Sequence, residues 1–338
     1  MRKNRLFSAV VSIIISLLLF SCKEYDDVYD PLETDHYWSY YSTDNGLPSD
    51  TITYVYEDNS GAIWVATKDK GVARLSGNTW TTFDTDDGLL KNKVMSIAQD
   101  KKGDIWFSTS FGFSVYDGSN FTNIQKTTND EWIFADEMII DKRGWVWATD
   151  YYNQGFYLYD GFTMYYFLYY KESIANVIAL AENNAGTVFL ACYGSVFLFR
   201  VTSSGQEFVD YSPSSKLYAD YTKAMFFDSR GDSWFGHLAA DKVTRISSGD
   251  ADYINLFNGW SYTNVTSILE DDQNNIWFTM MQGGVIKYNG IEPQTFGINS
   301  GLSGDGVNCS MKDNSGNLWF GTNGNGISIY HPVTYENN

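Results

Sequence analysis

Hydrophobic and polar positions repeat along the chain with a period of about 42 residues. An aromatic residue marks each repeat, at Trp64, Trp106, Trp147, Phe189, Trp234, Trp277 and Trp319. Around each of them, short apolar runs alternate with polar turns rich in Gly, Asn and Asp. Units of this length with several short strands are typical of propeller blades. The pattern therefore predicts an all-β chain folded as a seven-bladed β-propeller of four-stranded antiparallel blades.

The second repeat shows the four expected strands most clearly. They are predicted at Val94–Asp100, Ile105–Thr109, Phe113–Tyr116 and Phe121–Ile124. Each run is rich in β-branched and aromatic residues, and a few turn-forming residues separate it from the next. Connections this short join antiparallel neighbours. We name the four strands of a blade A to D in chain order.

The turn between strands A and B has its own signature, an acidic residue followed three positions later by glycine. The pairs are Asp58/Gly61, Asp100/Gly103, Asp141/Gly144, Asp228/Gly231 and Asp313/Gly316, with Asn183/Gly186 and Asp271/Asn274 as variants. An aspartate at the first turn position caps its own backbone, and Gly or Asn tolerates a positive φ at the fourth. Each loop has too few carboxylates for a calcium cage, so we expect no metal site.

The two ends of the repeat region predict how the ring closes. The last repeat ends with Ile327–Tyr330 and lacks a strand D. Near the N-terminus, Trp38–Leu47 matches the true strand D segment Trp80–Leu89 at identical spacing. Residues 36–42 are therefore expected to complete blade 7 and to remove an exposed sheet edge. This places the propeller at residues 36–335.

The N-terminal 35 residues predict export and lipid anchoring. Three basic residues precede the apolar run Leu6–Phe20, as in a signal peptide. The run ends in Leu-Phe-Ser-Cys22, which resembles the bacterial lipobox with Cys22 as the lipidated residue. We expect a signal peptide at 1–21 and an acidic tether at 22–35, with an uncleaved anchor as the alternative. The acidic stretch after Cys22 resembles the surface-export signal of Bacteroidetes lipoproteins, which favours an outer-membrane lipoprotein on either the surface or the periplasmic face.

Charge and cysteine content narrow the partners. The net charge is −18, and removing residues 1–21, with three basic and no acidic residues, takes it to −21. Such a chain repels phosphate backbones, so we expect no nucleic-acid partner and membrane contact only through the lipid. Cys192 and Cys309 fall in blades 4 and 7, and we interpret both as small buried hydrophobic residues rather than a disulfide.

The motif Gly-x-Ile/Leu-Trp-Phe/Val-x-Thr-x-x-Gly, with Gly-Leu upstream, resembles the two-component regulator propeller repeat. The best copies are Gly46-Leu47 with Gly61–Gly71, Gly88-Leu89 with Gly103–Gly112, and Gly301-Leu302 with Gly316–Gly326. The resemblance spans residues 36–335 and is weakest in blades 3 to 5. It implies an extracytoplasmic sensor region of the kind found in hybrid histidine kinases that are tied to glycan use. Because no kinase or receiver sequence follows the repeats, we expect signalling through an envelope protein partner.

Loops on one face vary most, and there we expect a glycan or another small polar ligand. In the propeller topology, the D–A and B–C loops share this face. The variable B–C loops are predicted at residues 149–155, 236–242 and 279–283, and they contain Asp150 and His237. Aromatic candidates for stacking on sugar rings are Trp132, Tyr151, Tyr152, Tyr193, Trp260 and Tyr262. Packing within the fold is the alternative for each of them.

Aligning the A strands at the turn acid gives a second set of candidates at the channel mouth. The aligned ring is Thr53, Met95, Asp136, Ile178, Lys223, Thr266 and Asn308. Glu137 follows Asp136, and charged residues in an innermost strand are costly unless wet or paired. We therefore propose Asp136, Glu137, Lys223 and Asn308 as ligand-binding residues. A solvated channel without a ligand is the alternative.

The sequence gives catalysis little support. It contains three histidines, His36, His237 and His331, and none forms a recognisable pair with a carboxylate. We find no Ser-His-Asp motif, phosphate loop or zinc spacing, so we expect neither catalytic residues nor a cofactor. A propeller lyase similar to the streptogramin lyases, acting on a polysaccharide or a cyclic ester, is the alternative.

Overall fold

The computed structural model describes residues 36–333, except 151, 153–154, 169–176, 193, 203–204, 213–215 and 257–263. The predicted signal peptide, Cys22 and the acidic tether lie outside the described residues. The chain divides into a large compact unit, Trp38–Pro332, and a second unit made of residues 1–37 and 333–338. In the part of the chain that the structure describes, no helix has the length and apolarity that a membrane span requires.

The large unit consists of seven sheets of four antiparallel strands each. Blades 1 to 3 contain β2(Ile52–Glu57), β3(Ile63–Thr67), β4(Val72–Ser76), β5(Thr79–Phe83), β6(Val94–Gln99), β7(Ile105–Thr109), β8(Gly112–Tyr116), β9(Phe121–Ile124), β10(Ala135–Ile140), β11(Val146–Asp150), β12(Gly155–Tyr159) and β13(Met164–Leu168). Blades 4 and 5 contain β14(Ala179–Glu182), β15(Val188–Cys192), β16(Ser195–Thr202), β17(Gly205–Ser212), β18(Thr222–Phe227), β19(Ser233–His237), β20(Val243–Ser247) and β21(Asp250–Ile254). Blades 6 and 7 contain β22(Val265–Glu270), β23(Ile276–Met280), β24(Val285–Tyr288), β25(Pro293–Phe296), β26(Val307–Lys312), β27(Leu318–Thr322), β28(Ile327–Pro332) and β1(His36–Tyr41).

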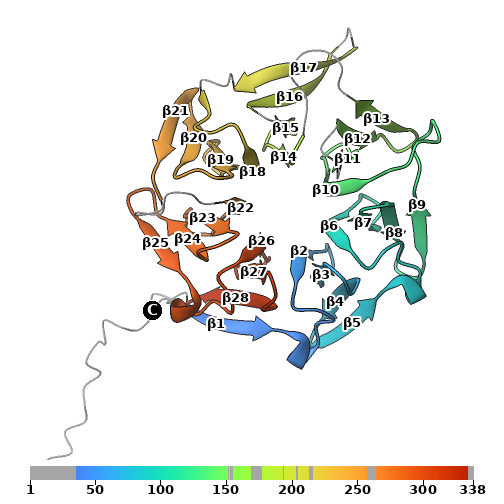
Figure 1. The fold of residues 1–338 in the computed structure, drawn as a ribbon, viewed down its shortest axis with the longest axis horizontal. Helices are drawn as coiled ribbons and strands as arrows, with labels where there is room; N and C mark the ends of the chain where they lie inside the picture. The colour runs from blue at the N-terminus through green and yellow to red at the C-terminus, as the bar shows by residue number, and fades with distance from the viewer. Residues whose placement is uncertain are drawn as a thin grey trace, which may run out of the picture. The chain divides into compact units, whose positions relative to one another are not determined.

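The seven sheets stand around a common axis, with the first strand of each blade innermost (Figure 1). In the last sheet the order is β1-β28-β27-β26, so the N-terminal strand completes blade 7. The predicted fold class and its closure by the N-terminal strand are confirmed. The predicted strands of blade 2 agree with β6 to β9 to within one residue at either end.

The hydrophobic core lies between neighbouring blades. Seven clusters of buried residues form, and each joins the facing sheets of two adjacent blades. At the junction of blades 1 and 2, the Trp64 ring lies 5.5 Å from the Phe107 ring. Trp64 is 1% exposed and Phe107 is fully buried. The recurring strand B aromatic residue is therefore the centre of each junction, which explains why it marks the repeat.

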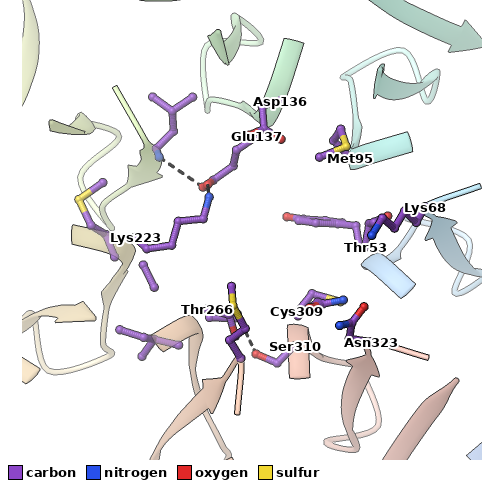
Figure 2. A pocket seen from close by; sticks show the side chains of 18 of the residues that line it. Thr53, Lys68, Met95, Asp136, Glu137, Lys223, Thr266, Cys309, Ser310 and Asn323 are labelled. Carbon is purple, nitrogen blue, oxygen red and sulfur yellow. Dashed lines mark hydrogen bonds and ion pairs between the residues drawn. The ribbon is translucent and has the colours of Figure 1, made fainter. Parts of the chain in front are cut away.

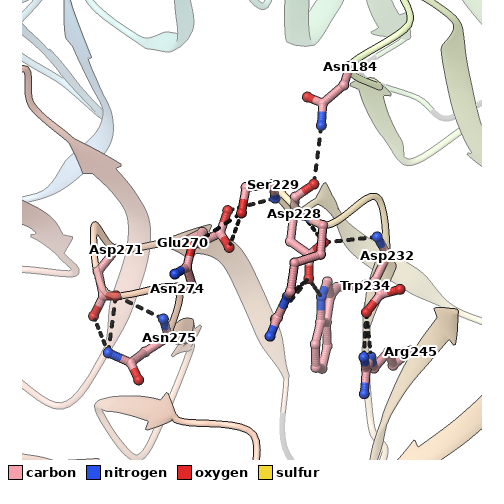
Figure 3. A network of polar contacts seen from close by, with 11 residues as sticks. Asn184, Asp228, Ser229, Asp232, Trp234, Arg245, Glu270, Asp271, Asn274 and Asn275 are labelled. Atoms are coloured by element: carbon pink, nitrogen blue, oxygen red, sulfur yellow. Dashed lines mark hydrogen bonds and ion pairs between the residues drawn. The ribbon is translucent and has the colours of Figure 1, made fainter.

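The turn aspartate fixes this tryptophan in place. Oδ1 of Asp58 accepts hydrogen bonds from the backbone N–H groups of Ser60 and Ala62, while Oδ2 accepts one from the indole Nε1 of Trp64 at 2.8 Å. The same aspartate–tryptophan bond forms in blades 2, 3, 5, 6 and 7. Figure 3 shows it for Asp228 and Trp234. Each aspartate therefore ties a surface turn to the core.

The D–A connections explain the Gly-Leu pair of the repeat. Short 3₁₀ helices, η1(Thr43–Asn45), η2(Thr85–Asp87) and η4(Ile298–Ser300), precede the glycines of three repeats. Gly46 has φ +123°, and a Cβ there would collide with the ring of Trp80. Gly301 stands in the same relation to Trp38 in β1. The closure strand therefore receives the same aromatic–glycine contact as a true strand D.

A ring of polar contacts joins the blades on the face of the A–B turns. The side chain at the end of strand A accepts a hydrogen bond from a backbone N–H in the adjacent blade's turn. The pairs are Glu57 with Asn314, Gln99 with Asn59, Glu182 with Lys142, and Glu270 with Ser229. Figure 3 shows the last of these bonds. These hydrogen bonds hold neighbouring blades together on this face.

Candidate functional site

A pocket of about 560 Å³ opens at the ring axis, and all seven A strands contribute to it. Its lining includes Thr53, Met95, Asp136, Glu137, Leu180, Lys223, Thr266 and Asn308 from these strands, and Lys68, Met281 and Asn323 from B–C loops. It therefore lies on the face of the variable loops. Figure 2 shows its lining from close by. Its volume is in the range of small-molecule sites.

Three polar residues of the predicted channel ring form hydrogen bonds between neighbouring blades. The Thr53 hydroxyl donates to the Val94 carbonyl at 2.6 Å, and the Thr266 hydroxyl donates to the Val307 carbonyl at 2.7 Å. The Asn308 amide donates to the carbonyl of Ile52 at 2.8 Å. In each case the ring residue of one blade bonds the first strand of the next. Asn308 lines the pocket, but its amide N–H₂ group serves the fold.

The opposite part of the ring breaks this pattern, because blade 2 has Met95 and blade 3 has Asp136 at the equivalent positions. Glu137 and Lys223 instead meet across the inner end of blade 4. Their Oε2 and Nζ atoms are 3.5 Å apart. Oε1 of Glu137 accepts the Leu180 N–H at 3.3 Å, and Nζ of Lys223 donates to the Ile178 carbonyl at 3.3 Å. Figure 2 shows the two side chains converging.

The two neighbouring carboxyl groups have unusual electrostatics. Partial burial raises the pKa of Glu137, while Lys223 and the Leu180 N–H act in the opposite direction. Burial also raises the pKa of Asp136, opposed by the charges of Lys223 and Lys93. Among the described residues, the Asp136 carboxylate has no hydrogen-bond or ion-pair partner, although it faces the pocket. The structure thus brings Asp136, Glu137 and Lys223 together, as the sequence predicted.

Asp150 requires a correction, because it is the last residue of β11 and not part of a loop. It pairs with Ala135 in the sheet and is 3% exposed. Its Oδ1 accepts the Tyr152 N–H at 3.0 Å, and its Oδ2 accepts the Tyr166 hydroxyl at 2.6 Å. The carboxylate is therefore occupied in holding the start of the B–C loop.

His237 requires the same correction. It ends β19, pairs with Thr222 and is fully buried. Its Nδ1 lies 3.2 Å from the Thr222 hydroxyl, and its Nε2 lies 2.9 Å from the Thr244 hydroxyl. Burial lowers its pKa to about 4, so the ring is neutral at physiological pH. Both ring nitrogens are engaged inside blade 5, which makes this histidine a structural residue.

Trp132 and Tyr152, the aromatic candidates among the described residues, are not part of the pocket lining. Trp132 and Tyr152 are 54% and 59% exposed. Nζ of Lys126 lies 4.9 Å from the Trp132 ring centre, and the Tyr152 ring contacts Phe134 at 5.2 Å. Phe134 in turn contacts Phe111. Tyr151, Tyr193, Trp260 and Tyr262 lie outside the described residues. The sequence did not single out Phe111 and Phe134, because neither position departs from the repeat pattern.

The pocket offers little for metal or covalent chemistry. Within the described ranges, no group of three or more His, Cys, Asp or Glu side chains is arranged to hold a metal ion. The thiol of Cys309 lines the pocket, but burial raises its pKa to about 12 and keeps it protonated. Cys192 and Cys309 are both free and buried, as predicted.

The repeat motif matches a known sequence family at four places. The family description is two-component regulator propeller, and the matched residues are 46–69, 88–111, 259–282 and 301–324. The chain carries two-component regulator propeller repeats. The matched repeats fall in blades 1, 2, 6 and 7. Asp136, Glu137 and Lys223 belong to blades 3 and 5, outside these matches. The candidate charges therefore lie where the chain departs from the repeat.

Solved propellers share the fold at low sequence identity. One is the extracellular domain of BT3049 from B. thetaiotaomicron, described as a hybrid two-component system, with 16% identity and a TM-score of 0.70. A second is the extracellular domain of BT4673 from the same organism, described as a one-component system, with 15% identity and a TM-score of 0.71. The match covers 87% and 86% of this chain, but only 42% and 39% of those two chains.

A streptogramin B lyase is similar to the same degree. Its identity is 15% and its TM-score is 0.71, over 88% of this chain and 97% of the lyase. No curated protein matches the chain in sequence. At these identities the likeness establishes the propeller fold, which sensor domains and a lyase share.

Proposed function

We propose that the chain is a non-catalytic, extracytoplasmic ligand-binding propeller that takes part in sensing through a partner protein. The observation that carries this proposal is that the channel ring has inter-blade hydrogen bonds on one side and charged side chains on the other. In blades 6, 7 and 1, the ring side chains bond to the next blade. In blades 3 and 5, Asp136, Glu137 and Lys223 bring charged groups to the pocket lining, although Glu137 and Lys223 also bond to the backbone of blade 4. The Asp136 carboxylate stands in an inner strand without a hydrogen-bond or ion-pair partner among the described residues, and a charge kept there at such a cost favours a ligand.

The sensing role is favoured by the repeat family and by the neighbouring folds. Two neighbours are extracellular domains of proteins described as two-component or one-component systems. We propose the cell envelope as the location, with Cys22 as the lipid anchor on the outer membrane and an envelope protein as the partner. The lipobox and the acidic residues that follow it support this proposal.

Glycans are one proposed ligand class. The exposed aromatic residues Trp132 and Tyr152 lie on the loops of the face where the pocket opens, and aromatic faces of this kind can stack on sugar rings. The lyase alternative rests on the shared fold with the streptogramin B lyase. Neither His237 nor His331 lines the pocket. A general acid–base role for either residue therefore has no geometric support in this site.

The test is a ligand screen by calorimetry, with glycans and other small polar compounds, followed by variants of the ring. Asp136→Ala and Lys223→Met should each weaken binding by about tenfold or more, since each removes a charged contact. Thr266→Val is the matched control, because it removes a polar group from the equivalent position of blade 6 without touching this charge cluster. If Thr266→Val weakens binding and the charge variants do not, the site is wrongly assigned. Formation of unsaturated products from the same panel would favour the lyase.

A further inference from the structure

The pocket carries two opposite charges that the fold does not use. The Asp136 carboxylate, in blade 3, has no hydrogen-bond or ion-pair partner among the described residues. The same holds for the Lys68 ammonium, whose backbone N–H bonds to Thr51 while its exposed side chain lines the pocket. Asp136 lies in β10 of blade 3 and Lys68 directly follows β3 of blade 1, and Figure 2 shows both beside the pocket with Met95 of blade 2 between them.

The other two charges in the lining neutralise each other. Glu137 and Lys223 form an ion pair at 3.5 Å. The lining therefore holds two acidic and two basic residues, on a chain whose net charge is −18. The charged residues of the lining thus sum to zero, whereas the chain as a whole is strongly acidic. A ligand with a single charge would leave either Asp136 or Lys68 uncompensated within the pocket.

The lining also has an apolar and flexible part, in which Met95 lies between the two charges. Met95, Met281, Ile139 and Leu180 contribute to the lining, and Met281 is 46% exposed. Among the described lining residues, Tyr54 alone is aromatic. Methionine side chains adapt to irregular apolar groups. A neutral sugar would find no wide aromatic platform here, whereas a small molecule with charged ends and an apolar middle would be complemented along its length.

We propose that the pocket binds a small zwitterion, with the ligand's ammonium at Asp136, its carboxylate at Lys68 and its apolar part on Met95 and Met281. This inference rests on the proposed function and names the ligand class of the same site. The gain comes from charge-assisted hydrogen bonds at a partly desolvated carboxylate and a free ammonium. A short peptide and an acidic amino sugar share this chemistry.

The experiment compares matched ligands by calorimetry on the complete chain. One arm uses tri-alanine, N-acetyl-tri-alanine and tri-alanine amide. The other uses muramic acid and N-acetylmuramic acid, which lacks the free amine. The zwitterionic member of at least one arm should bind, and removal of either charge should weaken it by about tenfold or more. The arm that binds distinguishes a peptide from an amino sugar.

Two charge variants and one control test the assignment of each end. Asp136→Asn should abolish the preference for the free amine over its acetylated form and keep the preference for the free acid. In the tri-alanine series, Lys68→Met should abolish the preference for the free acid over the amide. Thr266→Val should keep both preferences. Failure of both zwitterions to bind at 10 mM, about the weakest affinity that such contacts imply, would overturn the inference. Binding of neutral oligosaccharides that depends on Asp136 would also overturn it, while leaving the proposed function intact.

Discussion

Asn183 and Phe189 stand in blade 4 where the other six blades have an aspartate hydrogen-bonded to a tryptophan six residues later. The Asn183 oxygen still accepts the turn N–H groups of Ala185 and Thr187. Phenylalanine has no N–H to donate, so a second carboxylate oxygen has no role there. The two replacements are therefore complementary: one oxygen of the turn residue caps the turn, and the second oxygen of the aspartate accepts the indole N–H where a tryptophan is present.

The first prediction reproduces this pair in blade 1. Asp58→Asn should destabilise the protein by about 2–3 kcal/mol, because an amide N–H₂ would face the buried indole N–H of Trp64. In the background of Trp64→Phe, the same change should cost about 1–2 kcal/mol less. Urea denaturation of the four proteins measures the coupling. Asp117→Asn, in an exposed C–D turn without a tryptophan partner, is the control. Additive effects of Asp58→Asn and Trp64→Phe would contradict the division of roles.

The second prediction concerns pH and His237. Burial lowers its pKa from 6.5 to about 4. Between pH 4 and pH 6.5 the imidazole is therefore protonated in the unfolded chain and neutral in the folded chain. Its contribution to stability is complete above pH 6.5 and is lost as the pH falls toward 4. At pH 5 the loss should be about 2 kcal/mol. His237→Gln can bond the same threonines without titrating, and its stability should fall less between pH 7 and pH 5. Parallel profiles for the two proteins would contradict the assignment.

The third prediction concerns ring closure. Trp38 in β1 contacts the rings of Phe296, Phe320 and Tyr330 at 5.3–6.0 Å. Deleting residues 23–42 removes these contacts and exposes the edge of β28, so the melting temperature should fall for the whole ring in a single transition. Trp80→Ala removes the equivalent side chain of blade 1 and leaves its sheet intact, and this control should lower stability less than the deletion. Unchanged melting after the deletion would exclude the closure.

The fourth prediction concerns the lipid anchor. Cys22→Ala should remove the thiol that is acylated and transfer the protein from the membrane fraction to the soluble fraction. Fractionation of cells that express each form, with immunoblotting, measures the change. Cys192→Ala is the control, since that thiol is buried in blade 4 and is not exposed to an acylating enzyme. Continued membrane association of Cys22→Ala would instead support an uncleaved anchor.

The sequence predicted the fold well because the decisive signals are local and repeated. The turn acid, the positive-φ residue and the strand B tryptophan all lie within seven residues, and each copy reinforces the alignment of the others. The match of Trp38–Leu47 with Trp80–Leu89 predicted closure for the same reason. The alignment also placed Thr53, Asp136 and Lys223 around one pocket, since equivalent positions in a ring share one depth along the axis.

The roles of individual polar side chains were harder to predict, because they depend on a neighbouring strand or blade. Asn308 has a carbonyl within reach only because Ile52, 256 positions away, begins the adjacent strand. Asp150 and His237 resembled loop residues because their partners, Tyr166 and Thr244, belong to other strands of the sheet. Lys68 lies in a regular repeat, where nothing in the sequence distinguished it.

The pairing of β1 with β28 also governs the order in which the protein can fold. Ser39 and His331, whose side chains lie 2.7 Å apart across these strands, are separated by 292 positions in the chain. The first strand to leave the ribosome must therefore wait for nearly every other strand before it finds its partner. Such distant pairing is slow, because chain entropy must be lost before the contact forms. Blades 1 to 6 can assemble by local hairpins, so the final event in maturation should be the capture of the N-terminal strand.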